Sequence, residues 1–218
     1  MPREARTRST SPRTNSAERI ERAAVLLFAK RGFVGTSIRD LAAEVGVSSA
    51  NIYNHTHSKE DMLWKIISRT MDDLISIATS STAVSNCPVA QLESFMRSHI
   101  IYHATHRGEA RIGNTQWRHL SDERAQIVHA QRDDYTNTLV GIIARGVEEG
   151  FFTERQPKYL AFSLVAMGLG VSQWFRSSGE KSADEVADIY MSFVRNAVGL
   201  DNESHESGCP DPGHPQLT

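Results

Sequence analysis

Residues 36–59 of the chain, TSIRDLAAEVGVSSANIYNHTHSK, decide its fold. In the first part, apolar side chains recur at the 3.6-residue spacing of a helix, at Ile38, Leu41, Ala42 and Val45. Gly46 follows, where a tight turn needs a residue that tolerates positive φ. The next segment is short and polar around one apolar anchor, Ile52, and its hydroxyl and amide groups suit contact with base edges in the major groove. The stretch therefore predicts a helix-turn-helix.

The composition of the 218 residues is that of an ordinary soluble protein, with 39% hydrophobic and 23% charged residues. No apolar run reaches the ~18 residues of a membrane span, and the N-terminus has no apolar core like that of a secretory signal. Cys87 and Cys209 lie far apart, which argues against a cysteine zinc site. We therefore expect a cytoplasmic protein with no cofactor, no bound metal and no membrane contact.

The overall charge of −2 conceals an asymmetry between the two ends of the chain. Residues 1–69 hold 12 Lys/Arg and 7 Asp/Glu, a net charge of +5, whereas the remaining residues hold 12 Lys/Arg and 19 Asp/Glu, a net charge of −7. A basic first third joined to an acidic remainder indicates that only the first part faces the phosphates of DNA.

Helical patterns account for nearly the whole chain, so the predicted fold class is all-α, a three-helix helix-turn-helix domain followed by a larger helical domain for ligand binding and dimerisation. Asn15, Ser58 and Ser182, each with an acidic residue three positions later, are expected helix starts. The helix that begins at Ser58 is expected to run past Leu74. The predicted segments are a flexible basic arm at 1–14, the helix-turn-helix at 15–62, the larger domain at 63–200 and a disordered tail at 201–218.

Residues 20–63 contain the motifs FAKRGF-x-x-TS, IRDLAAEVGVS and IYNHTHSKEDML. Through these motifs, this segment resembles the DNA-binding domain of the TetR family of one-component bacterial repressors. Two positions depart from the family pattern. Asn54 stands where a second aromatic residue is common, and Thr56 stands where phenylalanine is common. The change at Asn54 would alter a contact with the DNA groove, and the change at Thr56 would alter the packing of the turn before the next helix.

The resemblance implies a double-stranded DNA partner and a role for each matching residue. Phosphate contacts are implied for Ser37, Arg39 and Lys59. Base contacts are implied for Ser49, Ala50 and Asn51 in the segment after the turn, and backbone contacts for Tyr53 and His55. An alternative is that Tyr53 packs in the core and Lys59 is only solvated. The full predicted DNA-binding set is Ser37, Arg39, Ser48, Ser49, Ala50, Asn51, Tyr53, Asn54, His55 and Lys59.

The second part of the chain is similar to a TetR subgroup that responds to acyl-CoA thioesters, through HLSDERAQIVHAQRDDY, GVEEGFF and QWFRSSGEKSADEVADIY. This similarity implies a small apolar or acyl-CoA-type inducer, with a cationic or aromatic drug as the competing ligand. The aromatic residues would line an apolar pocket and the arginines would meet an anionic group. The alternative is that these aromatics form the core and the arginines are solvated. The predicted ligand-binding residues are Tyr102, His103, Arg111, Trp117, Phe162, Trp174 and Arg176.

His99, His103 and His106 share one helix face, a spacing that can suit a metal. No HExxH motif or cysteine partner accompanies them, so lining of a ligand cavity or a surface stripe is the favoured interpretation. We also expect residues 158–175 and 182–198 to pair with their copies in a homodimer, because small residues there permit close approach.

The sequence carries no motif of an enzyme. There is no GxSxG, no Gly-rich phosphate loop after a strand and no paired-carboxylate motif. The predicted function is a ligand-responsive transcriptional regulator that represses by binding a palindromic operator as a homodimer. The remaining alternative is a helical ligand-binding protein or enzyme that does not bind DNA.

Overall fold

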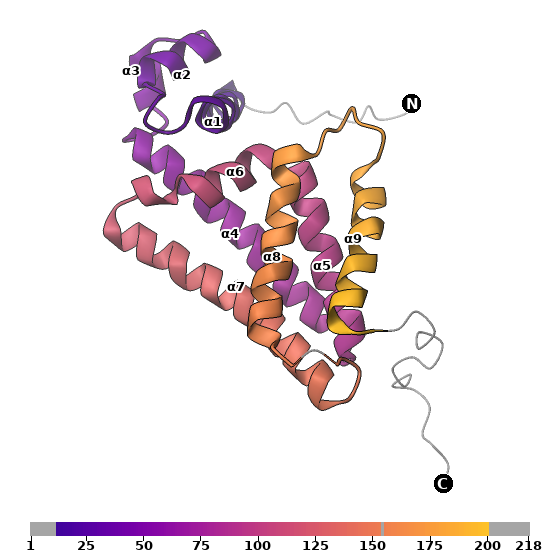
Figure 1. Cartoon of the computed structure of the whole chain (residues 1–218). Coiled ribbons are helices and arrows are strands. Elements are labelled where there is room, and N and C mark those ends of the chain that lie inside the picture. The colour runs from indigo at the N-terminus through magenta and orange to yellow at the C-terminus, as the bar shows by residue number, and fades with distance from the viewer. Residues whose placement is uncertain (1–11, 154, 201–218) are drawn as a thin grey trace, which may run out of the picture.

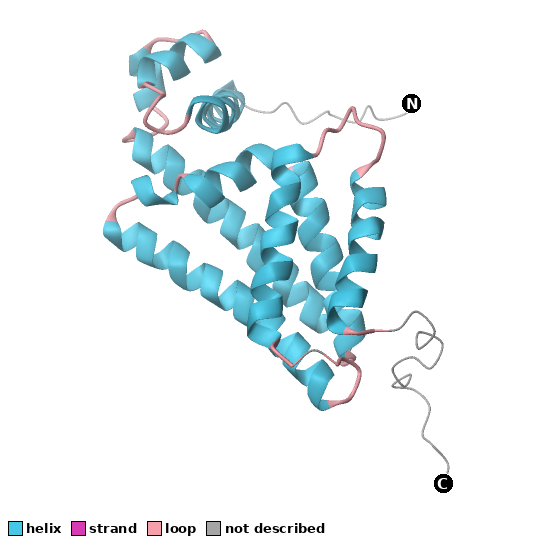
Figure 2. Cartoon of the chain, viewed as in Figure 1, coloured by secondary structure: helices cyan, strands magenta, loops and turns pink. Residues whose placement is uncertain are grey.

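A computed structural model of the chain describes residues 12–153 and 155–200. Helices make up the fold, and the described residues contain no strand (Figure 2), which confirms the predicted all-α class. The helices are α1 (Pro12–Arg31), α2 (Ile38–Val45), α3 (Ser49–Tyr53), α4 (Lys59–Ala83), α5 (Pro88–Thr105), α6 (Arg107–Thr115), the short 3₁₀ helix η1 (Trp117–His119), α7 (Asp122–Glu148), α8 (Pro157–Trp174) and α9 (Ala183–Val198).

The first three helices form a small unit, here called the head, on the N-terminal end of α4 (Figure 1). Its centre is apolar and closed, with Phe28, Leu41, Ile52 and Leu63 fully buried from four different helices. Each of these side chains gains roughly 1.5–3 kcal/mol from leaving water. A helix as short as α3 is unstable by itself, so this shared core is what holds α3 in place.

The remaining helices form a larger unit, here called the body, with α5 between its neighbours α4, α7, α8 and α9 (Figure 1). Phe95, Met96 and Ile100 on α5 are fully buried and meet side chains from all of these helices. Because α5 is covered on nearly every side, its sequence shows little helical periodicity in polarity. No helix among the described residues is long and apolar enough to cross a membrane.

Helix α4 belongs to both units, because its first turns close the head and its later turns build the body. The Ser58 side chain accepts a hydrogen bond from Asp61 N, which confirms the helix start expected there. The expected continuation beyond Leu74 is also confirmed, as the helix reaches Ala83. Its 25 residues span about 37 Å at 1.5 Å per residue.

At the N-terminal end, helical structure begins earlier than the sequence predicts. Helix α1 begins at Pro12, earlier than the start expected at Asn15, so the last three positions of the predicted basic arm are helical. Residues 1–11 and the predicted tail at 201–218 lie outside the described residues. The start of α9 is confirmed, because Ser182 and Glu185 form a reciprocal capping box.

Sequence reasoning did not anticipate α6. Its sequence, RGEARIGNT, holds two glycines, and no side chain caps its start. Packing explains why it is helical: a Cβ on Gly108 would lie 2.7 Å from Val25 Cγ1 of α1, and one on Gly113 would lie 3.5 Å from Thr70 Cγ2 of α4. Tertiary contact therefore overrides a weak local propensity, and α6 sits where the head meets the body.

Candidate DNA-binding site and ligand cavity

The turn between α2 and α3 has the geometry of a helix-turn-helix. Gly46 adopts the left-handed conformation at φ 75°, which lets its N–H and that of Val47 both donate to Ala42 O. Any residue with a Cβ would be strained at this φ. Ser48 then caps α3 by accepting a hydrogen bond from Asn51 N. These contacts fix the direction in which α3 leaves the head.

The outer side of α3 is open to solvent and polar. Ser48, Ala50, Asn54 and His55 are exposed, Ser49 and Asn51 are half-buried, and Ile52 alone is buried as the anchor. Tyr53 is 54% exposed, so the alternative that it packs in the core does not hold. We call the exposed and half-buried side chains of residues 48–55 the recognition face. It presents hydroxyl, amide, methyl and aromatic groups on one small convex surface.

Ser37 serves as a helix cap in this structure. Its hydroxyl donates to Asp40 Oδ2 at 2.6 Å, and the backbone N–H of Ser37 donates to the same oxygen at 2.8 Å. These hydrogen bonds hold the pKa of the Asp40 carboxyl below its usual value. The hydroxyl proton is therefore already committed to Asp40, whereas the neighbouring Arg39 is exposed.

Lys59 also makes contacts within the head. Its Nζ donates to Phe33 O and to Thr36 O, each at 2.8 Å, and lies 4.2 Å from the centre of the Phe33 ring. Partial burial lowers the pKa of this amine. Lys59 thus ties the start of α4 to the loop before α2, a structural role that the sequence did not reveal.

Contacts with the body hold two parts of the head, the loop before α2 and the first turn of α4. Gln116 Oε1, just after α6, accepts a hydrogen bond from Phe33 N at 3.1 Å, and the His119 ring stacks on the Phe33 ring at 5.4 Å. Arg124 at the start of α7 pairs with Glu60 at 3.2 Å and Asp61 at 2.6 Å. The loop before α2 is therefore held by Gln116 and His119, and the first turn of α4 is held by Arg124 of α7.

A cavity of about 150 Å³ lies inside the body, and we call it the core cavity. Its wall comes from five helices, α4, α5, α6, α7 and α8. Its exposed surface is mostly carbon, although seven of the thirteen lining residues carry a polar side-chain group. The lining residues are Thr70, Met71, Leu74, His99, His103, Ala110, Gly113, Asn114, Arg132, Tyr135, Thr136, Val165 and Leu169.

Two histidines on α5 face this cavity in different states. The His99 ring contacts Tyr135 OH through Nδ1 at 2.8 Å and Val165 O through Nε2 at 3.2 Å, so both of its nitrogens are satisfied. His103 is 1% exposed, and neither of its ring nitrogens has a hydrogen-bond partner. Burial lowers the pKa of His99 to about 4 and that of His103 to about 2, so both rings are neutral at pH 7.

Arg132 on α7 is a cavity residue that the sequence analysis missed. Its guanidinium donates to Gly113 O and lies 5.5 Å from the centre of the Trp117 ring. No carboxylate of residues 12–153 and 155–200 pairs with it. Only the packing of α7 against α6 places Arg132 at the cavity, so no sequence signal identified it.

The predicted ligand-binding residues do not form one pocket. Of that set, only His103 lines the core cavity. Phe162 is 47% exposed and Trp174 49% exposed on the outside of α8, and Trp117 is half-buried in η1. Arg176 is exposed, and its Nη1 donates to three carbonyls at the end of α8, those of Gln173, Trp174 and Phe175.

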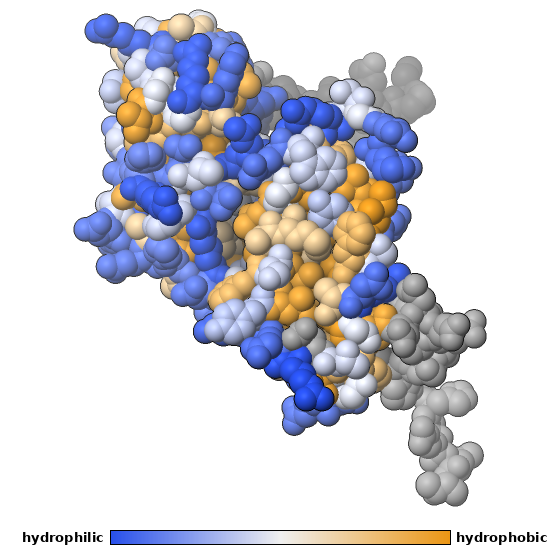
Figure 3. All heavy atoms as spheres, in the orientation of Figure 1, coloured by the Kyte–Doolittle hydropathy of each residue, from blue (hydrophilic) through white to orange (hydrophobic). Residues whose placement is uncertain are grey.

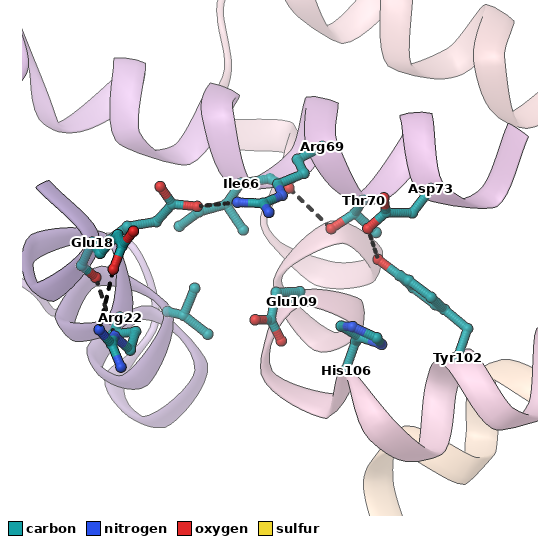
Figure 4. A pocket seen from close by; sticks show the side chains of 11 residues that line it. Glu18, Arg22, Ile66, Arg69, Thr70, Asp73, Tyr102, His106 and Glu109 are labelled. Atoms are coloured by element: carbon teal, nitrogen blue, oxygen red, sulfur yellow. Dashed lines mark hydrogen bonds and ion pairs between the residues drawn. The ribbon is translucent and has the colours of Figure 1, made fainter. Parts of the chain in front are cut away.

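Tyr102 and Arg111 line two other hollows at the boundary of head and body. Arg111 lies in an open groove of about 910 Å³ with Arg22, Lys30 and Arg107. Tyr102 lies in a crevice of about 470 Å³ between α1, α4 and α5–α6, here called the head–body crevice (Figure 4). There its hydroxyl donates to Asp73 at 3.3 Å and its ring stacks on that of His106 at 4.5 Å.

His99, His103 and His106 therefore have different surroundings, since His106, just after α5, is exposed and lines this crevice while His99 and His103 on α5 are buried. Within the described residues, no three His, Cys, Asp or Glu side chains gather as ligands of a metal ion.

Fold and recognition face together define a helix-turn-helix DNA-binding protein with a helical second domain. Comparison with known families agrees with this class. Residues 20–65 match the family described as bacterial regulatory proteins, tetR family, and residues 85–198 match the tetracyclin repressor-like C-terminal domain. The chain belongs to the TetR family of transcriptional regulators.

Individual relatives give the same assignment. The HTH-type transcriptional repressor KstR2 of Rhodococcus jostii is 30% identical over 178 residues, which cover 80% of this chain and 87% of that protein. A TetR-family regulatory protein from Rhodococcus RHA1 superposes with a TM-score of 0.77 at 27% identity, covering 88% of this chain and 100% of the other. AibR, solved with isovaleryl coenzyme A and operator DNA, superposes with a TM-score of 0.73 at 25% identity, covering 82% and 97%.

Proposed function

We propose that the protein is a homodimeric repressor that binds a two-fold symmetric operator through α3 and releases it when a small ligand occupies the body. The observation that carries this proposal is the recognition face, a capped helix whose outer side chains are exposed and polar while a single anchor, Ile52, is buried. The similarity to KstR2, a transcriptional repressor, supports repression as the effect of operator binding.

On DNA, the residues of the recognition face have separate tasks. Asn51 and Ala50 at the start of α3 would contact base edges, an amide with adenine and a methyl with thymine. Tyr53, His55 and the exposed Arg39 would contact the phosphate backbone, which positions the head without reading sequence. Lys59 contributes mainly by bracing the loop before α2, because two of its three donors are already engaged.

The proposed dimer forms through α8 and α9. These helices expose Tyr159, Phe162, Trp174, Ile189 and Phe193, which are 40% to 65% accessible in the single chain. Figure 3 shows apolar surface gathered over this part of the body. Such a contiguous patch on a regulator that needs two heads is a natural interface with a second copy.

The proposed inducer is a small apolar or acyl-CoA-type molecule. Support comes from the core cavity, with its largely apolar wall, and from the similarity to AibR, which was solved with isovaleryl coenzyme A. Thr70, Met71 and Leu74 of α4 form part of the cavity wall, so a ligand there contacts the helix that carries the head. The ligand would favour release through its greater affinity for the state in which the heads do not fit the operator.

The second candidate is a repressor that responds to cationic ligands. The head–body crevice favours it, because Glu18, Glu21, Asp73 and Glu109 outnumber Arg22 and Arg69 there, beside the stacked rings of Tyr102 and His106. Figure 4 shows Glu109, His106 and Tyr102 opposite the α1 side chains across this opening. A cationic aromatic dye that stabilises the protein and releases DNA, while acyl compounds are inert, would favour this candidate.

The test is footprinting of the purified protein on the region around its own gene. Protection should be two-fold symmetric, with half-sites about 34 Å or a multiple apart. Asn51→Ala should cost about 1–3 kcal/mol at one base pair of each half-site, whereas Asn137→Ala, an exposed asparagine on α7, should bind as the wild type does. Absence of any protected site, or an equal loss on all sequences for Asn51→Ala, would contradict the proposed reading of bases by α3.

A further inference from the structure

The core cavity contains a polar group that the folded chain leaves unsatisfied. His103 is 1% exposed and its two ring nitrogens contact no donor or acceptor of the protein. An unmade hydrogen bond on a buried polar atom destabilises a fold, and most such atoms in native proteins are paired. A leucine of similar size would fill the same space without this cost. The imidazole is therefore suited to bind a group that enters the cavity from outside.

A second polar group on the same wall carries an uncompensated charge. Arg132 is partly buried, and no carboxylate of the described residues lies within ion-pair distance of its guanidinium. A buried cation is stabilised by an acceptor oxygen, best of all by a carboxylate that two N–H groups can meet. Gly113 O supplies only one acceptor. The cavity therefore offers a hydrogen-bonding imidazole and a guanidinium to an incoming oxygen.

The apolar part of the cavity wall determines which hydrocarbon group a ligand can carry. Met71, Leu74, Val165 and Leu169 present hydrocarbon from α4 and α8. A volume of about 150 Å³ matches that of an apolar protein cavity that holds one benzene molecule. The space thus accepts a branched chain of a few carbons or one aromatic ring, and no more than that.

We propose that the core cavity binds a compact acyl group, with its oxygen toward His103 and Arg132 and its hydrocarbon against Met71, Leu74, Val165 and Leu169. This assignment rests on the proposed function, since it names the chemistry of the inducer. A free carboxylic acid and an acyl thioester share this chemistry, because both place a carbonyl oxygen at the end of a small apolar group. The unpaired guanidinium favours the free acid, whose charge it would balance.

Calorimetric titration and thermal shift with four probes test the proposal. The probes are isovalerate, benzoate, isovaleryl-CoA and, as an apolar control, toluene. The wild type should bind at least one acyl probe more tightly than toluene. His103→Leu should melt roughly 2–4 °C higher without ligand and bind that probe about tenfold or more weakly. His103→Gln, which keeps hydrogen-bonding groups, should retain part of the affinity.

Arg132→Gln separates the two sources of the acyl group. If the free acid is the ligand, this substitution should lower the affinity for isovalerate and benzoate by about tenfold or more, and the affinity for isovaleryl-CoA by less. Arg111→Gln is the matched control, because Arg111 lies in the open groove outside the cavity and should change neither affinity.

Two results would overturn the proposal: no binding of any acyl probe by a wild-type protein that binds its DNA, or unchanged affinity in His103→Leu. Loss of affinity in Arg111→Gln but not in Arg132→Gln would move the anionic group to the groove. Failure of the proposed function is a different result, namely that the wild type protects no DNA, and the binding titrations do not depend on it.

Discussion

At the scale of single residues, the molecule uses polar side chains in two opposite ways. Ser37, Ser48 and Lys59 in the head satisfy backbone groups and so fix the geometry of the helix-turn-helix. His103 in the body satisfies nothing in the folded chain. The head is thus locally complete before it meets DNA, whereas the body retains an unfilled hydrogen-bonding position.

The buried histidines predict how stability depends on pH. Burial lowers the folded-state pKa of His99 to about 4 and of His103 to about 2, while both return to about 6.5 on unfolding. Below pH 6.5 the unfolded chain therefore binds protons that the folded chain does not. The free energy of unfolding should fall as the pH drops from about 6.5 towards 4, by roughly 1.4 kcal/mol per pH unit for each histidine.

Urea unfolding at pH values between 7.5 and 4.5 measures this slope. His103→Leu should show a shallower slope below pH 6.5, because one proton-binding group is gone. Asn137→Ala, which changes an exposed residue on α7 that carries no titratable group, should leave the slope as in the wild type. Equal slopes in the wild type and His103→Leu would mean that His103 is not held neutral by the fold.

At the scale of helices, α8 separates two kinds of small residue that the sequence could not tell apart. Ala166 is exposed on the same face as Phe162, one turn away, and belongs to the proposed interface. Gly168 faces inward, where a Cβ would lie 2.2 Å from His99 Cδ2. The close approach between subunits expected at the small residues of 158–175 therefore does not apply to Gly168, which allows close packing of α8 on α5 within one chain.

Two substitutions on α8 should have opposite effects. Ala166→Arg should yield a monomer with unchanged helicity, since it places a charge in the apolar interface without entering the core. Gly168→Ala should leave the dimer intact but destabilise the fold by about 1–3 kcal/mol, because the added methyl overlaps His99. Sedimentation velocity reports the first effect and thermal unfolding by circular dichroism the second. A dimeric Ala166→Arg protein would place the interface on other helices.

The helices themselves were predictable where their signals are local. Ser58 and Ser182 cap their helices, as the acidic residue three positions after each one indicated. Gly46 makes the tight turn that was expected at its position. The ligand site was less predictable, because residue type does not tell which side of a helix faces inward. Phe162 and Trp174 have the chemistry of a pocket but lie outside it, while Arg132 lies inside and looked like one solvated residue among several.

At the scale of the whole molecule, α6 connects the core cavity with the head. Ala110, Gly113 and Asn114 on α6 line the cavity, and Gln116, just beyond its end, holds Phe33 N in the loop before α2. The chain of contacts from a ligand to the helix-turn-helix is therefore short and passes through one hydrogen bond between head and body.

Gln116→Ala tests that connection. We expect it to bind DNA and inducer with nearly wild-type affinity when each is measured alone, since Gln116 belongs to neither site. The coupling between the two should weaken by about 0.5–2 kcal/mol, seen as a higher inducer concentration needed to release operator DNA. Asn137→Ala, which changes an exposed residue on α7, serves as the control. Release at the wild-type concentration would assign the coupling to α4 or to the other head–body contacts, those of His119 and Arg124.

The length of α4 sets how small a movement is enough for release. Met71 at the cavity wall and Lys59 at the head are twelve residues apart on one helix, about 18 Å. In the proposed dimer, a tilt of about 5° over that distance shifts each head by about 1.6 Å, and the two-fold axis doubles the change to about 3 Å between the heads. That is close to the ~3.4 Å rise of one base pair. In the proposed dimer, a ligand no larger than a benzene ring would therefore need to tilt α4 by only a few degrees to put both heads out of register with the groove.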